Sequence, residues 1–310
     1  MDKTPLIVVA GPTASGKTGL AIDICKAVNG QVVSADSMQI YKHMDIGTAK
    51  PSQQEQDGIV HHLIDIVPPT ENFSLADYVN VAHETIAQVH GTGMAPVMAG
   101  GTGLYIDTVI NNIDLAETEK DEALRQELAA FAAKHGNEAL HEKLKQPDPE
   151  SHARLHPNDV KRVVRALEVL YTSGQTISEH NRASRNRPSP YSALMMGIQW
   201  PREELYRRID LRVDQMMCQG LLQEVETLVA AGLNETHTAM QAIGYKELLQ
   251  YLAGSISQEE AIEKIKMESR RYAKRQLSWF ARHGEMLWFA PDQVEQAVMA
   301  AKTFLQQNKG

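Results

Sequence analysis

The chain has 310 residues, 43% of them hydrophobic, which is enough to bury the core of one large α/β domain with an insertion or second lobe. No apolar run reaches the roughly 18 residues of a membrane-spanning helix, so we expect no membrane association. The formal net charge of −8 argues against generalised adhesion to nucleic acid, and the isolated Cys25 and Cys218 are expected to be reduced thiols of a cytoplasmic protein.

The first predicted strand, residues 6–10, leads directly into a glycine-rich loop and a helix over residues 17–28. The loop reads GPTASGKT, which matches the phosphate-binding pattern G-x-x-x-x-G-K-[ST] in its strand–loop–helix context. Glycines let the loop N–H groups turn inward around an anion, the lysine adds a charge, and the threonine hydroxyl can ligand Mg²⁺. The predicted diphosphate-binding residues are Gly11, Pro12, Thr13, Ala14, Ser15, Gly16, Lys17 and Thr18.

The second predicted strand, residues 31–34, ends close to an aspartate, Asp36. A carboxylate just past the end of a strand beside the P-loop strand faces the phosphate site. There it can join a magnesium shell or act as a general base toward a nucleophile that attacks a group attached to the phosphates. The structural alternative is an N-cap for the next segment. Spacing alone leaves both interpretations open.

The next elements continue the alternation of strands and helices. A weaker strand is expected at residues 61–67, a helix at residues 74–90 with Ser74 as its N-cap, and a strand at residues 96–99. This alternation predicts an α/β fold with a doubly wound, mainly parallel sheet, which binds ligands at the carboxyl ends of its strands.

The strand at residues 96–99 ends in GGTGLY, residues 100–105. The two glycines allow close approach by a ligand, while Thr102 and Tyr105 offer hydroxyl groups. No apolar run ends in a convincing metal-binding aspartate, and the guanine signature Asn-Lys-x-Asp does not occur. The chain therefore has a phosphate-binding loop but lacks the other motifs of an ordinary NTPase.

The pattern becomes helical after residue 113. Residues 114–190 are predicted to form a helical insertion, and a strand at residues 193–198 resumes the core. The P-loop α/β core is assigned to residues 1–113 and 191–310. Its C-terminal third is expected to be mostly helical, at residues 202–231, 242–252, 258–283 and 292–307.

Basic residues gather in two tracts of this acidic chain. In the insertion, Lys161, Arg162 and Arg165 stand at i, i+1 and i+4, so they can share one helical face toward a polyanion. Lys274 and Arg275 offer a second surface on a late helix. Ordinary solvated helix faces are the alternative, and charge pattern alone does not decide between them.

Together these motifs resemble the tRNA dimethylallyltransferases, also called tRNA isopentenyltransferases. The blocks in the family's order are GPTASGKT, SADSMQIY, GGTGLY, HPNDVKRVVRALEV, WPREELYRRIDLRVD, AIGYKE and KRQLSWFAR. They span the chain from residue 6 to about residue 289 and are far more specific than the P-loop alone. Ser278 and Ala281 depart from the family pattern in the last block, and the chain lacks the C-terminal zinc finger of eukaryotic members.

The resemblance implies that the P-loop holds dimethylallyl diphosphate, with Mg²⁺ on Thr18, instead of a nucleoside triphosphate. The acceptor would be N6 of the adenosine on the 3′ side of a tRNA anticodon. Asp36 would align that amine and take its proton. Lys17, the loop N–H groups and Arg208 or Arg212 would neutralise the charge that develops on the leaving diphosphate.

The resemblance also implies that the target base leaves its stack in the anticodon stem-loop. The residues expected at or near that base are Asp36, Ser37, Met38, Gln39 and Thr102. Those expected along the rest of the tRNA are Lys161, Arg162, Val163, Val164, Arg165, Lys274, Arg275 and Gln276. We expect the protein to act as a monomer.

Three alternatives remain at this stage. A P-loop kinase of a small metabolite explains the loop and the insertion, although it leaves the later motifs unexplained. An adenylate isopentenyltransferase keeps the chemistry but uses a free nucleotide, which the basic C-terminal helices disfavour. A non-catalytic RNA-binding module does not account for the intact Lys17, Thr18 and Asp36.

Overall fold

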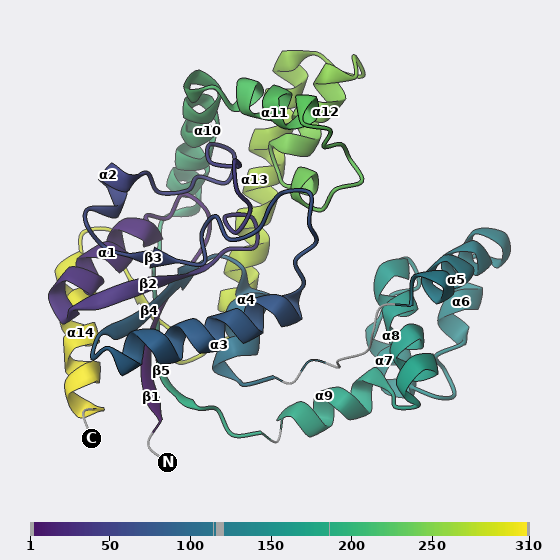
Figure 1. The fold of residues 1–310 in the computed structure, drawn as a ribbon, viewed down its shortest axis with the longest axis horizontal. Coiled ribbons are helices and arrows are strands. Elements are labelled where there is room, and N and C mark those ends of the chain that lie inside the picture. Colours follow the sequence, from purple (N-terminus) through teal and green to yellow (C-terminus); the bar gives the residue numbers. More distant parts are fainter. Residues whose placement is uncertain (1–2, 114, 116–120, 186, 309–310) are drawn as a thin grey trace. The chain divides into compact units, whose positions relative to one another are not determined.

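The structure is a computed structural model in which the chain forms two compact units (Figure 1). We call Met1–Val109 with Pro190–Gly310 the α/β unit and Ile110–Ser189 the helical unit. Residues 1–2, 114, 116–120, 186 and 309–310 are not described, so the predicted start of the insertion at residue 114 lies outside the described residues. In the part that is described, no helix is both long and apolar enough to cross a membrane.

The α/β unit is built on a parallel sheet with the strand order β3-β2-β4-β1-β5-β6 (Figure 1). Every neighbouring pair of strands is parallel, which confirms the predicted α/β class. The strands are β1 Thr4–Ala10, β2 Gly30–Ala35, β3 His61–His62, β4 Ala95–Gly100, β5 Tyr191–Ile198 and β6 Leu287–Phe289.

The strand expected at residues 61–67 is wrong beyond its second residue. Leu63 and Asp65 have φ of 62° and 56°, left-handed values that end the strand after His62. Farther along, Val67 forms only an isolated bridge with Tyr41. The three-residue β6 was not predicted, because it is too short to show a periodic pattern.

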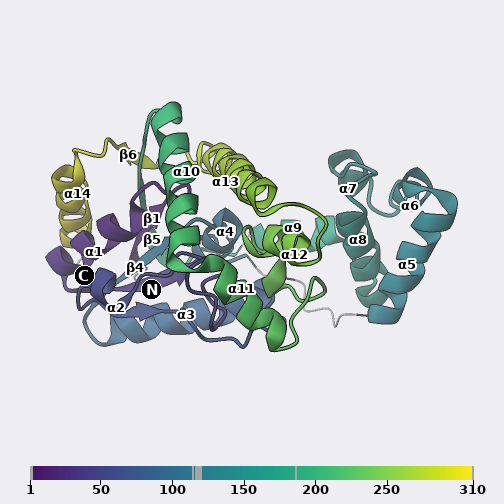
Figure 2. The same cartoon turned by 90° about the horizontal axis from the view of Figure 1, so that it is seen from above.

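Helices cover both faces of the sheet. Helix α1 (Lys17–Val28) and helix α14 (Val294–Gln307) lie side by side in both views (Figures 1 and 2). Their apolar side chains pack on Ile7 and Val9 of β1. Helix α3 (Leu75–Gly91) contacts β2 and β4 and leads back across the sheet in the opposite direction to α1, so it belongs on the other face. Ser74 caps α3 through a reciprocal capping box, as its sequence predicts.

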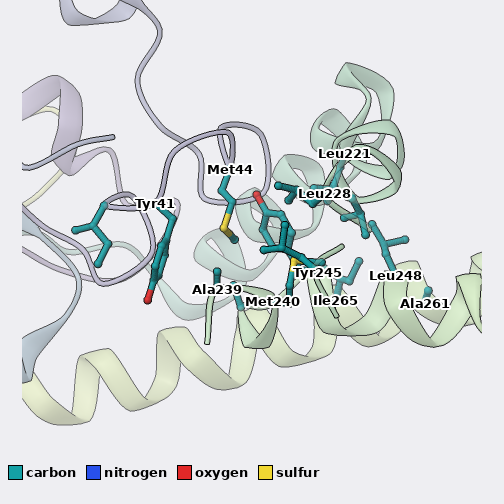
Figure 3. Close-up of a cluster of buried hydrophobic side chains, with 14 of the residues drawn as sticks. Tyr41, Met44, Leu221, Leu228, Ala239, Met240, Tyr245, Leu248, Ala261 and Ile265 are labelled. Atoms are coloured by element: carbon teal, nitrogen blue, oxygen red, sulfur yellow. The ribbon is translucent and has the colours of Figure 1, made fainter. Parts of the chain in front are cut away.

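The C-terminal helices form a second core with the loop that follows β2. Tyr41 and Met44 of that loop pack among Leu221, Tyr245 and Leu248 (Figure 3). The helices are α10 Arg202–Gln219, α11 Leu221–Ala230, α12 Tyr245–Leu252 and α13 Gln258–Phe280, with α2 Gln53–Gln56, α4 Gly103–Ile110 and the 3-10 turn Ala239–Gln241 elsewhere in the unit.

The single helix predicted over residues 202–231 is wrong, because Gly220 divides it. Gly220 has φ 102° and ends α10 in the left-handed conformation, after which α11 begins at once. The chain can therefore turn between two helices whose apolar periodicity looks continuous.

The helical unit has its own small core. Leu128, Leu140, Leu144, Val163 and Leu167 are buried together in it. Its helices are α5 Glu122–His135, α6 Asn137–Glu142, α7 Pro149–Arg154, α8 Val160–Ser173 and α9 Ile177–Arg185.

Candidate active site

The glycine-rich loop between β1 and α1 is held by side chains from distant parts of the α/β unit. Three hydrogen bonds of 2.9 Å fix its backbone, from Trp200 Nε1 to the Ser15 carbonyl, from Arg208 Nε to the Ala14 carbonyl, and from the Thr13 N–H to Gln276 Oε1. Gly16 then begins α1 at φ 92°, a conformation that disfavours a side chain. The buried Ser15 hydroxyl has no partner among the described residues, so it can donate to an anion. The loop is thus a preorganised anion site at a helix N-terminus.

Lys17 stands beside two other charged groups at this site. Burial and, to a smaller extent, the neighbouring Arg212 lower the pKa of Lys17 from 10.5 to about 8, while Asp36 acts in the opposite direction. Burial also lowers the pKa of Arg212, which lines the same cavity. Lys17 Nζ donates to the Pro12 carbonyl at 3.3 Å, so its ammonium lies over the loop. Two neighbouring cations of this kind favour a multiply charged anion.

Asp36 lies just beyond β2, where it caps the next turn and also faces the cavity. Its Oδ1 accepts the N–H of Met38 at 2.9 Å and that of Gln39 at 3.4 Å, so the carboxylate caps the following turn. Its Oδ2 accepts no hydrogen bond from the described residues, and Asp36 lines the cavity that Lys17 also faces. One oxygen therefore fixes the side chain while the other can receive a proton.

The carboxyl ends of β2 and β4 meet beside this carboxylate. Thr102 Oγ1 accepts the Ser37 N–H at 3.1 Å, and the Tyr272 side chain of α13 lies close to Thr102 and Asp36. The sequence placed Ser37 and Thr102 near one site from separate motifs, and the fold brings them into contact. No sequence motif had indicated that Tyr272 lies at the site.

The two glycines at the carboxyl end of β4, Gly100 and Gly101, are required for close packing. A Cβ on Gly100 would collide with the Ala35 backbone, and one on Gly101 would collide with the Gln276 amide. Gly101 also accepts the Gln276 Nε2 hydrogen bond at its carbonyl, at 2.9 Å. These glycines therefore let β2, β4 and α13 pack closely, and Gly100 also lines the cavity described below.

Most of the predicted site residues of the α/β unit line one cavity of about 1680 Å³, the exceptions being Gly11, Pro12, Ser15, Thr102 and Lys274. That volume exceeds the roughly 300–1,000 Å³ of an ordinary small-molecule pocket, so it has room for two reactants. Lys17, Thr18, Arg208 and Arg212 line it together with Asp36 to Gln39, and Asp36 lies close enough to Lys17 and Arg212 to affect their pKa values. Residues 45–56 form a further wall that sequence reasoning missed, since nothing in their composition signals a site.

The predicted contacts of the helical unit divide into exposed and buried side chains. Lys161 and Arg162 are exposed on α8, where Arg162 pairs with Asp159 at 3.2 Å. Arg165 is half-buried and pairs at 2.7 Å with Glu168, which is fully buried. Arg162 and Lys161 are available to a polyanion, whereas Arg165 is partly neutralised.

Three predicted contacts turn inward. Val163 and Val164 are 0% and 8% exposed in the core of the helical unit, because α8 is amphipathic and they occupy its apolar face. Gln276 is 5% exposed, and its amide accepts a hydrogen bond from the Thr13 N–H and donates one to the Gly101 carbonyl. The structure thus contradicts RNA contact by the side chains of Val163 and Val164. Gln276 lines the cavity while its amide supports the P-loop, and Lys274 and Arg275 on α13 are exposed.

A group of His141, Glu142 and His152 lies in the helical unit, with ligand atoms close enough for a metal ion. The two imidazole rings are stacked, 4.2 Å between centroids and 25° between planes, so their nitrogen lone pairs run side by side. Glu142 is also paired with Lys145 at 2.8 Å. The group is therefore a hydrogen-bonded packing cluster and does not form a converged metal site.

A parallel sheet, a P-loop after β1 and a carboxylate after β2 are features of a P-loop enzyme that acts on a phosphate compound. Strand β4 lies between β1 and β2, so the predicted position of Asp36 directly beside the P-loop strand is wrong. Residues 39–283 match the family described as IPP transferase. The tRNA dimethylallyltransferase of Halalkalibacterium halodurans is 46% identical over 287 residues, covering 93% of this chain and 91% of that protein. The corresponding enzyme of Acetivibrio thermocellus is 48% identical over 290 residues, covering 94% and 93%. The chain therefore belongs to the IPP transferase family, which includes these tRNA dimethylallyltransferases.

Solved structures give the same result. The tRNA isopentenylpyrophosphate transferase of Bacillus halodurans superimposes with a TM-score of 0.75 at 42% identity, covering 99% of this chain and 98% of that one. A eukaryotic dimethylallyltransferase, captured while acting on tRNA, gives a TM-score of 0.85 at 28% identity and covers 98% and 80%. The resemblance read from the motifs is confirmed.

Proposed function

We propose that this protein transfers the dimethylallyl group of dimethylallyl diphosphate to N6 of the adenosine 3′ to the anticodon in tRNA. The observation that carries the proposal is the shared cavity, in which an anion site and the Asp36 carboxylate face one space. Its relatives, named as tRNA dimethylallyltransferases, support the same substrates. They also favour this reaction over a metabolite kinase or an adenylate isopentenyltransferase.

The transfer needs help mainly at the leaving group, because the lone pair of an adenine N6 is delocalised. A bond forms between N6 and the allylic carbon, the bond from that carbon to the diphosphate oxygen breaks, and diphosphate leaves. Lys17, Arg208 and Arg212 lie where they can neutralise the charge that develops on the bridging oxygen. The proton lost from N6 passes to Oδ2 of Asp36.

A magnesium ion fits the phosphate end of the cavity. The Thr18 hydroxyl lines the cavity and forms no hydrogen bond with any residue that the structure describes, and hard oxygen donors suit Mg²⁺. When bound, Mg²⁺ would draw charge from the diphosphate oxygens. Thr18 holds the ion in this proposal, and the chain's own cations supply the remaining charge.

The exposed basic residues of both units are proposed to bind the tRNA anticodon stem-loop through its phosphates. Lys161 and Arg162 serve in the helical unit, and Lys274 and Arg275 serve in the α/β unit. Ser37, Met38, Gln39 and Thr102 are left to contact the flipped base and its neighbours. We propose that the protein acts as a monomer in the cytoplasm.

Incubation with dimethylallyl diphosphate, Mg²⁺ and unmodified tRNA, followed by mass analysis of the nucleosides, tests the proposal. The expected product is N6-dimethylallyl adenosine at the position next to the anticodon, with one diphosphate released per transfer. Free AMP serves as the competing acceptor. Modification of AMP alone, or ATP consumption on a small acceptor, would replace this function with one of the alternatives.

A further inference from the structure

Glu224 of α11 binds a loop far away in the sequence through both of its carboxylate oxygens. Its Oε2 accepts the N–H groups of Asp45 and Ile46, each at 2.8 Å, and its Oε1 accepts the Gly47 N–H at 3.1 Å. The Tyr245 hydroxyl adds a fourth bond to Oε1 at 2.5 Å. Hydrogen bonds to an ionised acceptor are roughly twice as strong as neutral ones. One side chain therefore fixes three successive peptide groups.

The loop at residues 45–47 is also held by packing against Tyr245. Gly47 lies against the ring of Tyr245, where a Cβ would collide with the aromatic carbons. Tyr245 is fully buried beside Met44, Leu221 and Leu248 (Figure 3). Burial and the neighbouring Glu224 raise the pKa of Tyr245, so its hydroxyl stays protonated and donates. We call Glu224, Tyr245 and Gly47 the loop clamp.

The clamped loop leads directly to a side chain of the cavity. Gln39 Nε2 donates to the carbonyls of Thr48 and Ala49, both at 3.2 Å, so both amide hydrogens are engaged. Its Oε1 accepts from the Ser34 hydroxyl at 3.3 Å and has room for a second donor. Because the loop carbonyls accept only from the NH₂ group, they determine which way the Gln39 carboxamide is turned. Gln39 thus offers the cavity an acceptor, next to Asp36.

We propose that Glu224 is a positioning residue for the acceptor half of the cavity. Through the loop at residues 45–49 it keeps the Gln39 carbonyl turned toward the incoming amine, although it touches neither reactant. The inference rests on the proposed function in so far as the acceptor is an amine-bearing base. The donor half is held separately by Trp200, Arg208 and Gln276, which are not part of the clamp.

The test compares Glu224→Gln with Glu226→Gln. The first keeps the size of the side chain but turns an NH₂ group toward donors, and the second removes an exposed carboxylate from the same helix. In Glu224→Gln, amide hydrogen exchange at residues 45–49 should quicken, and kcat/KM for tRNA should fall by about ten- to hundredfold, the scale of losing a charged hydrogen bond. The dissociation constant for dimethylallyl diphosphate should stay within about twofold. Glu226→Gln should match the wild type in all three.

A double-mutant cycle with Gln39→Ala tests whether Glu224 acts through Gln39. The two changes together should cost no more kcat/KM than Gln39→Ala alone. Losses that multiply, unchanged exchange in the loop, or an equal loss of donor affinity would overturn the inference. If the wild type transfers no dimethylallyl group, the proposed function fails on its own. The clamp is then judged by hydrogen exchange and by the same cycle measured as tRNA affinity.

Discussion

Lys17 is expected to couple anion binding to proton uptake. Its pKa in the free protein is about 8, because burial and Arg212 disfavour the charged form. A bound diphosphate restores negative charge and raises that pKa, so binding near pH 8 should take up a proton. Above pH 8 the affinity should fall by up to about tenfold per pH unit, since the neutral amine must first be protonated.

Calorimetry with inorganic diphosphate and Mg²⁺, in two buffers of different ionisation enthalpy, measures this uptake. Lys17→Met is the matched control, because the ligand's own titration persists while that of the lysine is lost. Equal uptake in both proteins would show that Lys17 does not titrate on binding.

The same pKa shift has a consequence for stability in the free protein. The usual pKa of 10.5 applies to the unfolded chain, which therefore binds more protons than the folded chain between about pH 8 and 10.5. The contribution of Lys17 to the free energy of unfolding must rise with pH across that window. Below pH 8 its buried charge opposes folding at full strength.

The capping role of one Asp36 oxygen can be distinguished by substitution from the proposed base role of the other. Asp36→Asn keeps a carbonyl oxygen to accept the Met38 and Gln39 N–H groups, whereas it removes the base. Turnover should fall by roughly 10²- to 10⁴-fold with donor and tRNA affinities nearly unchanged. Asp36→Ala should lose turnover as well and also loosen the turn. Single-turnover transfer in Asp36→Asn at the wild-type rate would leave Asp36 as a cap alone.

On the scale of an element, α13 presents two neighbouring residues to opposite environments. Gln276 faces inward and bridges the P-loop to the end of β4, while Arg275 is exposed. Gln276→Ala leaves the Thr13 N–H without its acceptor, so diphosphate affinity should fall by about ten- to hundredfold. Arg275→Ala should weaken tRNA binding and spare diphosphate. Titration of both ligands against both variants checks the pair, and the reverse pattern would return Gln276 to the RNA surface.

The sequence predicted elements well where local signals mark their ends. Helix α1 begins and ends as predicted, because the P-loop pattern fixes its first turn and Asn29 adopts a left-handed C-cap. The 202–231 helix failed because a single glycine inside a periodic segment gives no sign of its left-handed φ. The strand after residue 62 failed because positive φ at Leu63 and Asp65 has no reliable local cue.

The sequence predicted the reactive groups of the candidate site, but it did not predict the residues that hold the site's loops in place. Lys17, Thr18 and Asp36 follow from short motifs next to strands. Trp200 and Glu224 hold loops more than 170 residues away in sequence, and only the folded chain shows that. Val163 and Val164 were predicted as tRNA contacts because of the motif in which they stand, but they lie on the apolar face of α8 and are buried.

Across the whole molecule, the exposed cations that could bind RNA are divided between the two units while the total charge is −8. Affinity for tRNA should therefore depend on a few local contacts and little on net charge. Each phosphate contact releases about one counterion, so its loss should lower the slope of log affinity against log salt by about 0.7 to 0.9.

The last prediction compares two double variants, Lys161→Ala with Arg162→Ala, and Lys274→Ala with Arg275→Ala. Each pair should reduce the salt slope by about 1.5 and leave diphosphate affinity unchanged, and the quadruple variant should show the sum, since each lost phosphate contact removes its own counterion release. Lys302→Ala, an exposed charge on α14, is the matched control and should leave the slope alone. Fluorescence anisotropy of labelled tRNA over a salt series measures the slopes. If only one pair changes the slope, tRNA is bound through that unit alone, because the charge of the other pair is then fully solvated in the complex.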